Sequence, residues 1–166
     1  EEKLARLKGA EAALIFNSGF QANLSLLPAL ADKKSLILSD RLNHRSIIEG
    51  ARLCRCALAV FRHNDLAHLE EILHKSRYLD YSRIFIVTES IFSMDGDSSD
   101  VKQLVEMARN YGAILVVDEA HATGVAGARG MGLTAGTAVD CCMGTFGKAL
   151  GSFGAYGTFS KEMRDY

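Results

Sequence analysis

The chain has 166 residues, of which 48% are hydrophobic and 23% are charged, and its formal net charge at pH 7 is −1. This composition is typical of one globular domain with a substantial core, and it excludes a disordered or fibrous chain. A charge this close to zero attracts neither nucleic acid nor an anionic membrane, and no apolar run approaches the roughly 20 residues that span a bilayer.

Short apolar runs of β-forming residues alternate with segments of helical periodicity. One apolar stripe of helical periodicity follows Asn64 or Asp65, either of which can act as the N-cap of that helix. A second stripe covers Val101–Ala108, and Gly112 is placed to end that helix. Glu1–Lys8 and Ser160–Tyr166 also have helical character. The predicted strands are Ala13–Phe16, Ser35–Ser39, Ala57–Phe61, Arg83–Thr88, Ala113–Asp118, Asp140–Gly144 and Gly154–Phe159.

Two of these strands are apolar on both faces. The runs Ile84–Val87 and Ile114–Val117 contain no polar residue, which is typical of a parallel sheet covered by helices on both sides. No internal repeat or linker interrupts the pattern. We therefore predict one α/β domain over residues 1–166, and the helical ends indicate a piece of a longer protein.

The four cysteines occur as Cys54-x-Cys56 and Cys141-Cys142, and neither spacing matches a zinc half-site. The charged start of the chain does not resemble a secretion signal, so we expect reduced thiols and a cytoplasmic location. Asp95-Gly96-Asp97 begins like a calcium loop but lacks its later ligands. We expect no metal site.

Polar residues with different chemistries follow the predicted strands. Because ligands gather at the carboxyl ends of parallel strands, these residues indicate a site for a small polar cofactor. They are Asn17, Ser18 and Gly19 after the first strand, Asp40 and His44 after the second, Glu89 and Ser93, then Asp118 and His121, and last Thr145 and Lys148. Taken singly, Asp118 could cap a turn and Lys148 could face solvent.

The letters Asp118-Glu119-Ala120-His121 also match a motif of nucleic-acid-stimulated ATPases. A phosphate-binding loop of that class needs Gly-x-x-x-x-Gly-Lys-Ser/Thr. The only Gly-Lys pair is Gly147-Lys148, which has Cys142 in place of the first glycine and Ala149 in place of the hydroxyl residue. The ATPase interpretation therefore fails at the sequence level.

Five segments together resemble the α-oxoamine synthases of the fold-type-I pyridoxal-phosphate superfamily. They occur in order along nearly the whole chain: Asn17–Asn23, Asp40–His44, Thr88–Asp97, Asp118–His121 and Gly144–Lys148. The resemblance implies a three-layer α/β/α, aminotransferase-like large domain with a mostly parallel seven-stranded sheet, its last strand antiparallel. It also implies that the small C-terminal domain of the family is absent.

The resemblance assigns catalytic roles to four residues. Lys148 would carry pyridoxal 5'-phosphate covalently and move protons at the substrate α-carbon, and Asp118 would keep the pyridine nitrogen protonated. His44 would stack on the ring, and Glu89 would belong to the nearby hydrogen-bond network.

Five further residues would bind the cofactor. Gly19 and Phe20, at the start of a helix, would meet the phosphate with help from Thr145. His121 would bond the ring hydroxyl, with Ser93 close to the same oxygen. His63 also resembles a family segment, but we interpret it as part of a turn and helix cap.

The reaction implied is a decarboxylative condensation of an amino acid with an acyl thioester. The residues around Ser18-Gly19-Phe20 and Gly144–Tyr156 favour the biotin-pathway branch, which joins L-alanine to a pimeloyl thioester on coenzyme A or carrier protein. Glycine with acetyl- or succinyl-coenzyme A is the alternative within the family, and a non-catalytic scaffold is the alternative outside it. The resemblance implies a homodimer with shared active sites, and we expect this piece alone to be inactive.

Overall fold

In the computed structural model, which describes residues 1–166, all seven predicted strands are present, and their ends lie within one residue of the predicted ones. The strands are β1 (Ala12–Phe16), β2 (Leu36–Asp40), β3 (Ala57–Phe61), β4 (Ile84–Glu89), β5 (Ile114–Asp118), β6 (Cys141–Thr145) and β7 (Ala155–Phe159). The helices are α1 (Glu2–Lys8), α2 (Gly19–Leu30), α3 (Arg45–Leu53), α4 (Leu66–Ser76), α5 (Val101–Tyr111) and α6 (Lys161–Asp165), with a short 3₁₀ helix at Ala128–Gly130.

The strands form one sheet in the order β1-β7-β6-β5-β4-β2-β3. β7 is antiparallel to both of its neighbours, while the remaining pairs are parallel. The prediction of six parallel strands and an antiparallel last strand is therefore confirmed, with the antiparallel strand lying between β1 and β6. The parallel register brings Glu89 of β4 beside Asp118 of β5.

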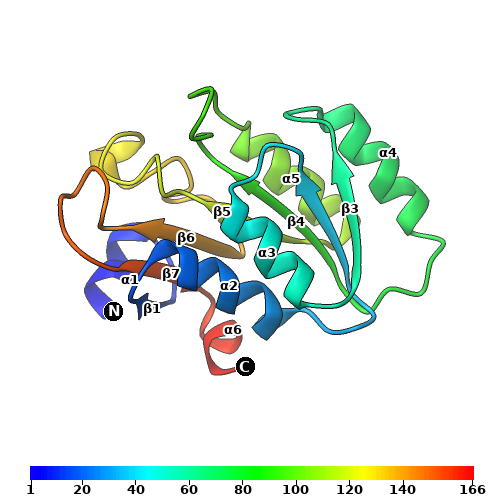
Figure 1. The fold of residues 1–166 in the computed structure, drawn as a ribbon, viewed down its shortest axis with the longest axis horizontal. Coiled ribbons are helices and arrows are strands. Elements are labelled where there is room, and N and C mark those ends of the chain that lie inside the picture. The colour runs from blue at the N-terminus through cyan, green and yellow to red at the C-terminus, as the bar shows by residue number, and fades with distance from the viewer.

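Helices cover both faces of the sheet and build two separate cores. On one face, α2 and α3 lie beside one another (Figure 1) and bury Leu27 and Ile47 against Phe85 and Met143. On the other face, α4 and α5 bury Leu69 and other apolar side chains against the sheet. The apolar runs of β4 and β5 are central because they contribute to both cores. The predicted three-layer α/β/α architecture is confirmed.

Side-chain caps define where several helices begin. Asp65 caps α4 by accepting a hydrogen bond from the His68 N–H, and Asn64 does not. His63 lies in the preceding turn as expected, but its interpretation as a helix cap is wrong. Gly112, with φ of +63°, ends α5 in the left-handed conformation predicted for it.

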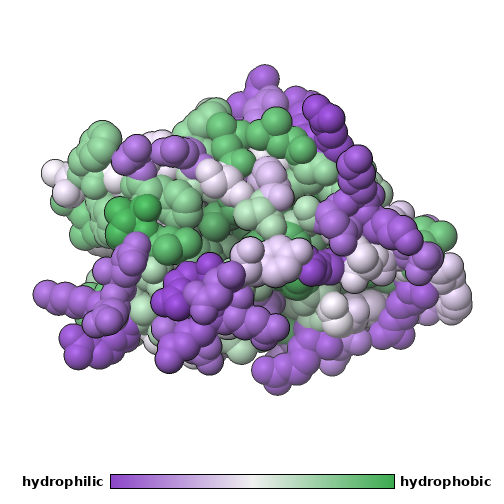
Figure 2. Space-filling model, turned by 90° about the horizontal axis from the view of Figure 1, so that it is seen from below, coloured by the Kyte–Doolittle hydropathy of each residue, from purple (hydrophilic) through white to green (hydrophobic).

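The surface combines hydrophilic and hydrophobic areas, and Figure 2 shows both on the face seen from below. None of the helices combines the length with the apolar character that crossing a bilayer requires. All four cysteines are free thiols, as predicted, and Cys141 and Cys142 are buried in β6.

A close helix crossing connects the fold to the polar edge of the sheet. A Cβ atom on Gly50 of α3 would lie 2.4 Å from the carbonyl oxygen of Asn23 in α2. We therefore expect Gly50→Ala to lower the free energy of unfolding by about 1–3 kcal/mol, because the two helices must separate. Urea denaturation measures this effect.

Ser25→Ala, at an exposed position of α2, is the matched control and should change stability by less than about 0.5 kcal/mol. Equal unfolding midpoints for the Gly50 variant and the wild type would show that the crossing is not tightly packed.

Candidate functional site

The carboxyl ends of β2, β4, β5 and β6 meet around a cavity of about 150 Å³. Eight of the nine residues predicted for the site line it: Gly19, Phe20, His44, Glu89, Asp118, His121, Thr145 and Lys148. A larger cavity of about 390 Å³ lies at the other end of β6. The ammonium group of Lys8 beside it is already paired with Glu119. The smaller cavity is therefore the candidate site.

Asp118 is a buried carboxylate at the tip of β5, where it is 5% exposed. Its Oδ1 accepts a hydrogen bond of 2.8 Å from the Ala120 N–H, and its Oδ2 accepts one of 2.8 Å from the Asn23 amide. No cationic side chain forms an ion pair with it. Burial raises its pKa above the ordinary value, against the effect of these two hydrogen bonds. A bound cation would offset the free-energy cost of burying the ionised carboxylate.

A chain of hydrogen bonds runs from Asp118 to His44 through two residues that the sequence did not single out. The Asn23 amide, which donates to Asp118, also lies 2.9 Å from the Ser46 hydroxyl oxygen. That oxygen lies 2.7 Å from Nδ1 of His44, which also accepts the Ser46 N–H. Nδ1 is therefore occupied, and the orientation of the ring is fixed.

Glu89 lies at the end of β4, next to Asp118, and is only 2% exposed. Its Oε1 accepts a hydrogen bond of 2.6 Å from the His44 N–H. Burial and the neighbouring Asp118 carboxylate raise the pKa of Glu89 to about 7. A carboxyl group with such a pKa can hold or release a proton near neutral pH.

Lys148 and His121 face each other from the loops after β6 and β5, with Nζ 2.5 Å from Nε2. Burial lowers the pKa of the Lys148 amine below its ordinary value, against the attraction of Asp118 and Glu89. Burial and the nearby ammonium group lower the pKa of His121 as well. A lysine with a depressed pKa is a better amine nucleophile.

Thr145 shapes the turn that carries Lys148. Its hydroxyl donates to the Gly154 carbonyl oxygen at 3.0 Å and accepts the Gly147 N–H at 3.2 Å. Gly154 has a φ of +96°, and a Cβ there would lie 2.9 Å from the Phe16 carbonyl oxygen. The contact predicted between Thr145 and a phosphate stays a prediction.

Gly19 and Phe20 open α2 at the edge of the cavity. Ser18 caps the helix by accepting the Gln21 N–H at 3.1 Å, so one of the free N–H groups of the first turn already has a hydrogen-bond acceptor. The helix spans 12 residues, and its free N–H groups give this end a partial positive charge. Such an end suits an anion, in agreement with the predicted role.

Ser93 is the one residue with an assigned role that does not line the cavity, and it is exposed on the loop after β4. Asn17, Ser18 and Asp40, which were predicted at the same edge, do not line the cavity either. Asn23 and Ser46, in contrast, line the cavity but were missed. A signal for Asn23 existed, because it follows the buried Ala22 and precedes Leu26 and Leu27 on the apolar face of its helix. A polar residue in such a stripe indicates a buried hydrogen bond.

Glu119 points away from the cavity although it follows Asp118 directly. Its buried carboxylate is hydrogen-bonded by the ammonium group of Lys8 in α1, by the Thr134 N–H at 2.8 Å and by the Thr134 hydroxyl at 2.6 Å. This ion pair connects α1 to the loop that follows β5. Of the two acidic residues in the ATPase-like motif, Asp118 therefore lines the cavity, and Glu119 stabilises the contact between α1 and the loop after β5.

Comparison with known proteins identifies related sequences over the whole chain. The model for the family described as aminotransferase class I and II matches residues 1–166. The chain is 61% identical to the Desulfosudis oleivorans protein named "Putative 8-amino-7-oxononanoate synthase". It is 51% identical to the 8-amino-7-oxononanoate synthase of Chlorobaculum parvum. All of this chain is covered in both cases, but only 43% of each relative, so the chain spans less than half of their length.

Solved structures resemble the fold closely. A serine palmitoyltransferase from S. paucimobilis, solved with PLP and myriocin bound, superposes with a TM-score of 0.90 at 30% identity, covering 99% of this chain and 43% of that one. The 8-amino-7-oxononanoate synthase of Francisella tularensis gives a TM-score of 0.85 at 31% identity, covering 100% and 48%.

The raised pKa of Glu89 makes stability depend on pH. Between the ordinary value of 4.5 and about 7, the folded chain holds a proton that the unfolded chain releases. The stabilising effect of that proton is therefore lost as the pH rises through this window. We expect Glu89→Gln to flatten the decline in unfolding free energy between pH 4.5 and 7, as measured by urea denaturation.

Glu106→Gln, at an exposed position of α5, is the control and should keep the wild-type slope. An unchanged slope in the Glu89 variant would contradict the assignment of the proton to Glu89.

Proposed function

Because the chain belongs to the aminotransferase class I and II family, we propose that it is the cofactor-binding part of a pyridoxal-phosphate-dependent acyltransferase of the α-oxoamine synthase type. One observation carries this proposal. The buried carboxylate of Asp118, which has no cationic partner, lines the same cavity as the amine of Lys148. A protonated pyridine ring with an aldehyde on its far side satisfies both groups.

The residues present fit pyridoxal phosphate in charge and in hydrogen-bonding capacity. Asp118 would hold the ring nitrogen, and Lys148 would bind the cofactor covalently. The start of α2 at Gly19 and Phe20 would hold the phosphate, and His121 would reach the ring hydroxyl. When bound, the cofactor supplies an electron sink for negative charge at the substrate α-carbon. The PLP-bound serine palmitoyltransferase, at 30% identity, supports this choice of cofactor.

The chain's own residues would orient the reacting groups and move the substrate proton. Asn23 keeps the Asp118 carboxylate turned toward the cavity, and the Ser46 hydroxyl holds the His44 ring at the cavity wall. Once released, the Lys148 amine would accept the proton from the substrate α-carbon, helped by its lowered pKa. His121 lies within hydrogen-bond distance of that amine and can orient it.

The names of the relatives support a choice of substrates. We propose that the longer protein condenses L-alanine with a pimeloyl thioester, on coenzyme A or carrier protein, in biotin biosynthesis. The products are 8-amino-7-oxononanoate, carbon dioxide and the free thiol of coenzyme A or the carrier protein. Relatives of that name, 61% and 51% identical, support this choice. Glycine with acetyl- or succinyl-coenzyme A is the alternative. A cytoplasmic location belongs to the same proposal.

The partner we propose is a second copy of the longer protein. Large apolar side chains are exposed at the start of α2 and on the loops that follow β2, β4, β5 and β6: Phe20, Leu42, Met94, Val125, Leu150 and Phe153. Apolar side chains gathered around a polar cavity mark a surface that is covered in an assembly. A homodimer whose active sites include residues from both subunits agrees with this arrangement.

Reduction with borohydride followed by peptide mapping tests the cofactor assignment. In the full-length protein incubated with pyridoxal phosphate, we expect the label on Lys148 and its complete loss in Lys148→Arg. Lys161→Arg, on the short helix α6, is the control and should be labelled like the wild type. A label on Lys161 or Lys102 in the wild type would overturn the assignment.

A substrate screen tests the choice of reaction. L-alanine, glycine and L-serine are each supplied with acetyl-, succinyl-, pimeloyl- and palmitoyl-coenzyme A, and release of coenzyme A is measured. We expect kcat/KM to be highest for L-alanine with the pimeloyl thioester, by at least about tenfold, a difference of about 1.4 kcal/mol in transition-state binding. A preference for glycine would assign the protein to the other branch.

A further inference from the structure

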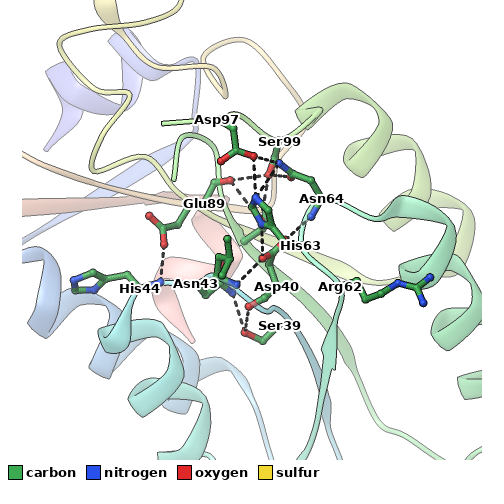
Figure 3. A network of polar contacts seen from close by, with 12 residues as sticks. Ser39, Asp40, Asn43, His44, Arg62, His63, Asn64, Glu89, Asp97 and Ser99 are labelled. Atoms are coloured by element: carbon green, nitrogen blue, oxygen red, sulfur yellow. Dashed lines mark hydrogen bonds and ion pairs between the residues drawn. The ribbon is translucent and has the colours of Figure 1, made fainter. Parts of the chain in front are cut away.

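His63 lies in the turn between β3 and α4, outside the cavity, with a side chain that is 22% exposed. Its Nδ1 is 2.9 Å from Oδ1 of Asp40, and its Nε2 is 2.8 Å from Oδ2 of Asp97. Its ring meets the buried Phe92 edge to face, with 4.4 Å between the ring centroids. Figure 3 shows the imidazole between the two carboxylates, one at the end of β2 and the other on the loop after β4.

The two contacts define the protonation state of the ring. An ionised carboxylate only accepts hydrogen bonds, and a neutral imidazole has one N–H donor. With both carboxylates ionised, both contacts are hydrogen bonds only when both ring nitrogens carry protons. The hydrogen bonds to Asp40 and Asp97 raise the pKa of His63 despite its burial, which itself lowers that pKa.

No other charged side chain pairs with the Asp40 and Asp97 carboxylates in place of His63. The groups that face the ring are Asp40, from the end of β2, and Asp97, from the loop after β4. On the turn that carries His63, the Arg62 guanidinium is paired with Asp65 at 2.7 Å. The imidazolium is therefore the cation shared by the two carboxylates.

Asp40 determines the path of the chain to His44. Its Oδ1 accepts the Leu42 N–H at 2.8 Å, and its Oδ2 accepts the Asn64 N–H at 3.0 Å. These bonds fix the turn that leads directly to His44, whose own N–H bonds Glu89. A change in the position of Asp40 is thus passed on to two residues that line the cavity.

Asp97 determines the shape of the loop that carries Ser93. Its carbonyl oxygen accepts the Phe92 N–H at 2.9 Å, which closes the loop, and its Oδ2 also accepts the Asn64 amide at 2.6 Å. A bridge between Ile91 and Ser98 narrows the loop further. His63 therefore connects this loop to the turn of His44 by one charged contact on each side.

We propose that protonated His63 is a positioning residue that fixes the His44 turn relative to the loop after β4, and so sets the positions of His44 and Glu89 in the cofactor site. The inference rests on the proposed function, because it concerns binding of pyridoxal phosphate. His63 touches neither the cavity nor the reacting atoms, and it acts through Asp40 and Asp97.

The first test is the protonation of the ring in the full-length protein without cofactor. Nuclear magnetic resonance of ¹⁵N-labelled histidines, assigned by comparison with His63→Gln, should show both nitrogens of His63 protonated at pH 7. They should lose one proton only as the pH rises above the ordinary histidine value of about 6.5. A neutral ring at pH 7 would overturn the proposal, whether or not the protein binds pyridoxal phosphate.

The second test is the affinity for pyridoxal phosphate as a function of pH. The wild-type affinity should decline as the pH rises through the pKa of His63, because one charged hydrogen bond is then lost. His63→Gln should bind roughly tenfold more weakly at pH 7, the ratio expected for the loss of one such contact. The affinity of this variant should also lack the part of the decline with rising pH that titration of His63 causes in the wild type.

His74→Gln is the control, because His74 is exposed on the neighbouring helix α4, and it should keep both the wild-type affinity and its pH profile. A His63 variant with the wild-type profile would overturn the proposal, even if its thermal stability were reduced. Failure of the wild type to bind pyridoxal phosphate at all would instead contradict the proposed function, while the titration of the ring would still decide the role of His63.

Discussion

The cost of burying the Asp118 carboxylate is the constraint on which the rest of the site depends. The group is at the end of a central strand, it is 5% exposed, and two hydrogen bonds satisfy it only in part. A buried charge of this kind is tolerated when a cation completes its environment. The neighbouring Glu89 responds in part to the same charge, because burial and the Asp118 carboxylate together raise its pKa to about 7. The edge of the sheet is thus arranged for a positively charged ligand.

The layers of the fold are what hold this arrangement in place. Asn23 reaches Asp118 from α2, and Ser46 reaches Asn23 from α3, so the packing of the two helices determines the hydrogen-bond chain. Gly50 allows that packing, since a side chain there would collide with the Asn23 backbone. On the opposite side, the buried pair of Lys8 and Glu119 supports the loop that carries His121. Core packing and site geometry are therefore coupled.

Much of the fold could be predicted from the sequence because the apolar runs are unambiguous. The runs Ile84–Val87 of β4 and Ile114–Val117 of β5 are apolar on both faces, and the ends of these strands were placed within one residue. The rim residues were found because the carboxyl ends of parallel strands meet at one edge. Chain order alone, however, does not state that β7 lies between β1 and β6.

What could not be predicted depends on contacts between residues far apart in the chain. His63 was interpreted as part of a helix cap because local spacing does not bring Asp40 and Asp97 to either side of it. Asn23 and Ser46 have no local partner either, and their importance follows from the crossing of two helices. Ser93 was placed by resemblance, and its loop holds it outside the cavity.

The most direct measurement of the central claim is a crystal structure of the full-length protein grown with pyridoxal phosphate. We expect cofactor density continuous with the Lys148 side chain, and the ring nitrogen within hydrogen-bond distance of an Asp118 oxygen. Density bound at another lysine, or a ring nitrogen facing away from Asp118, would contradict it.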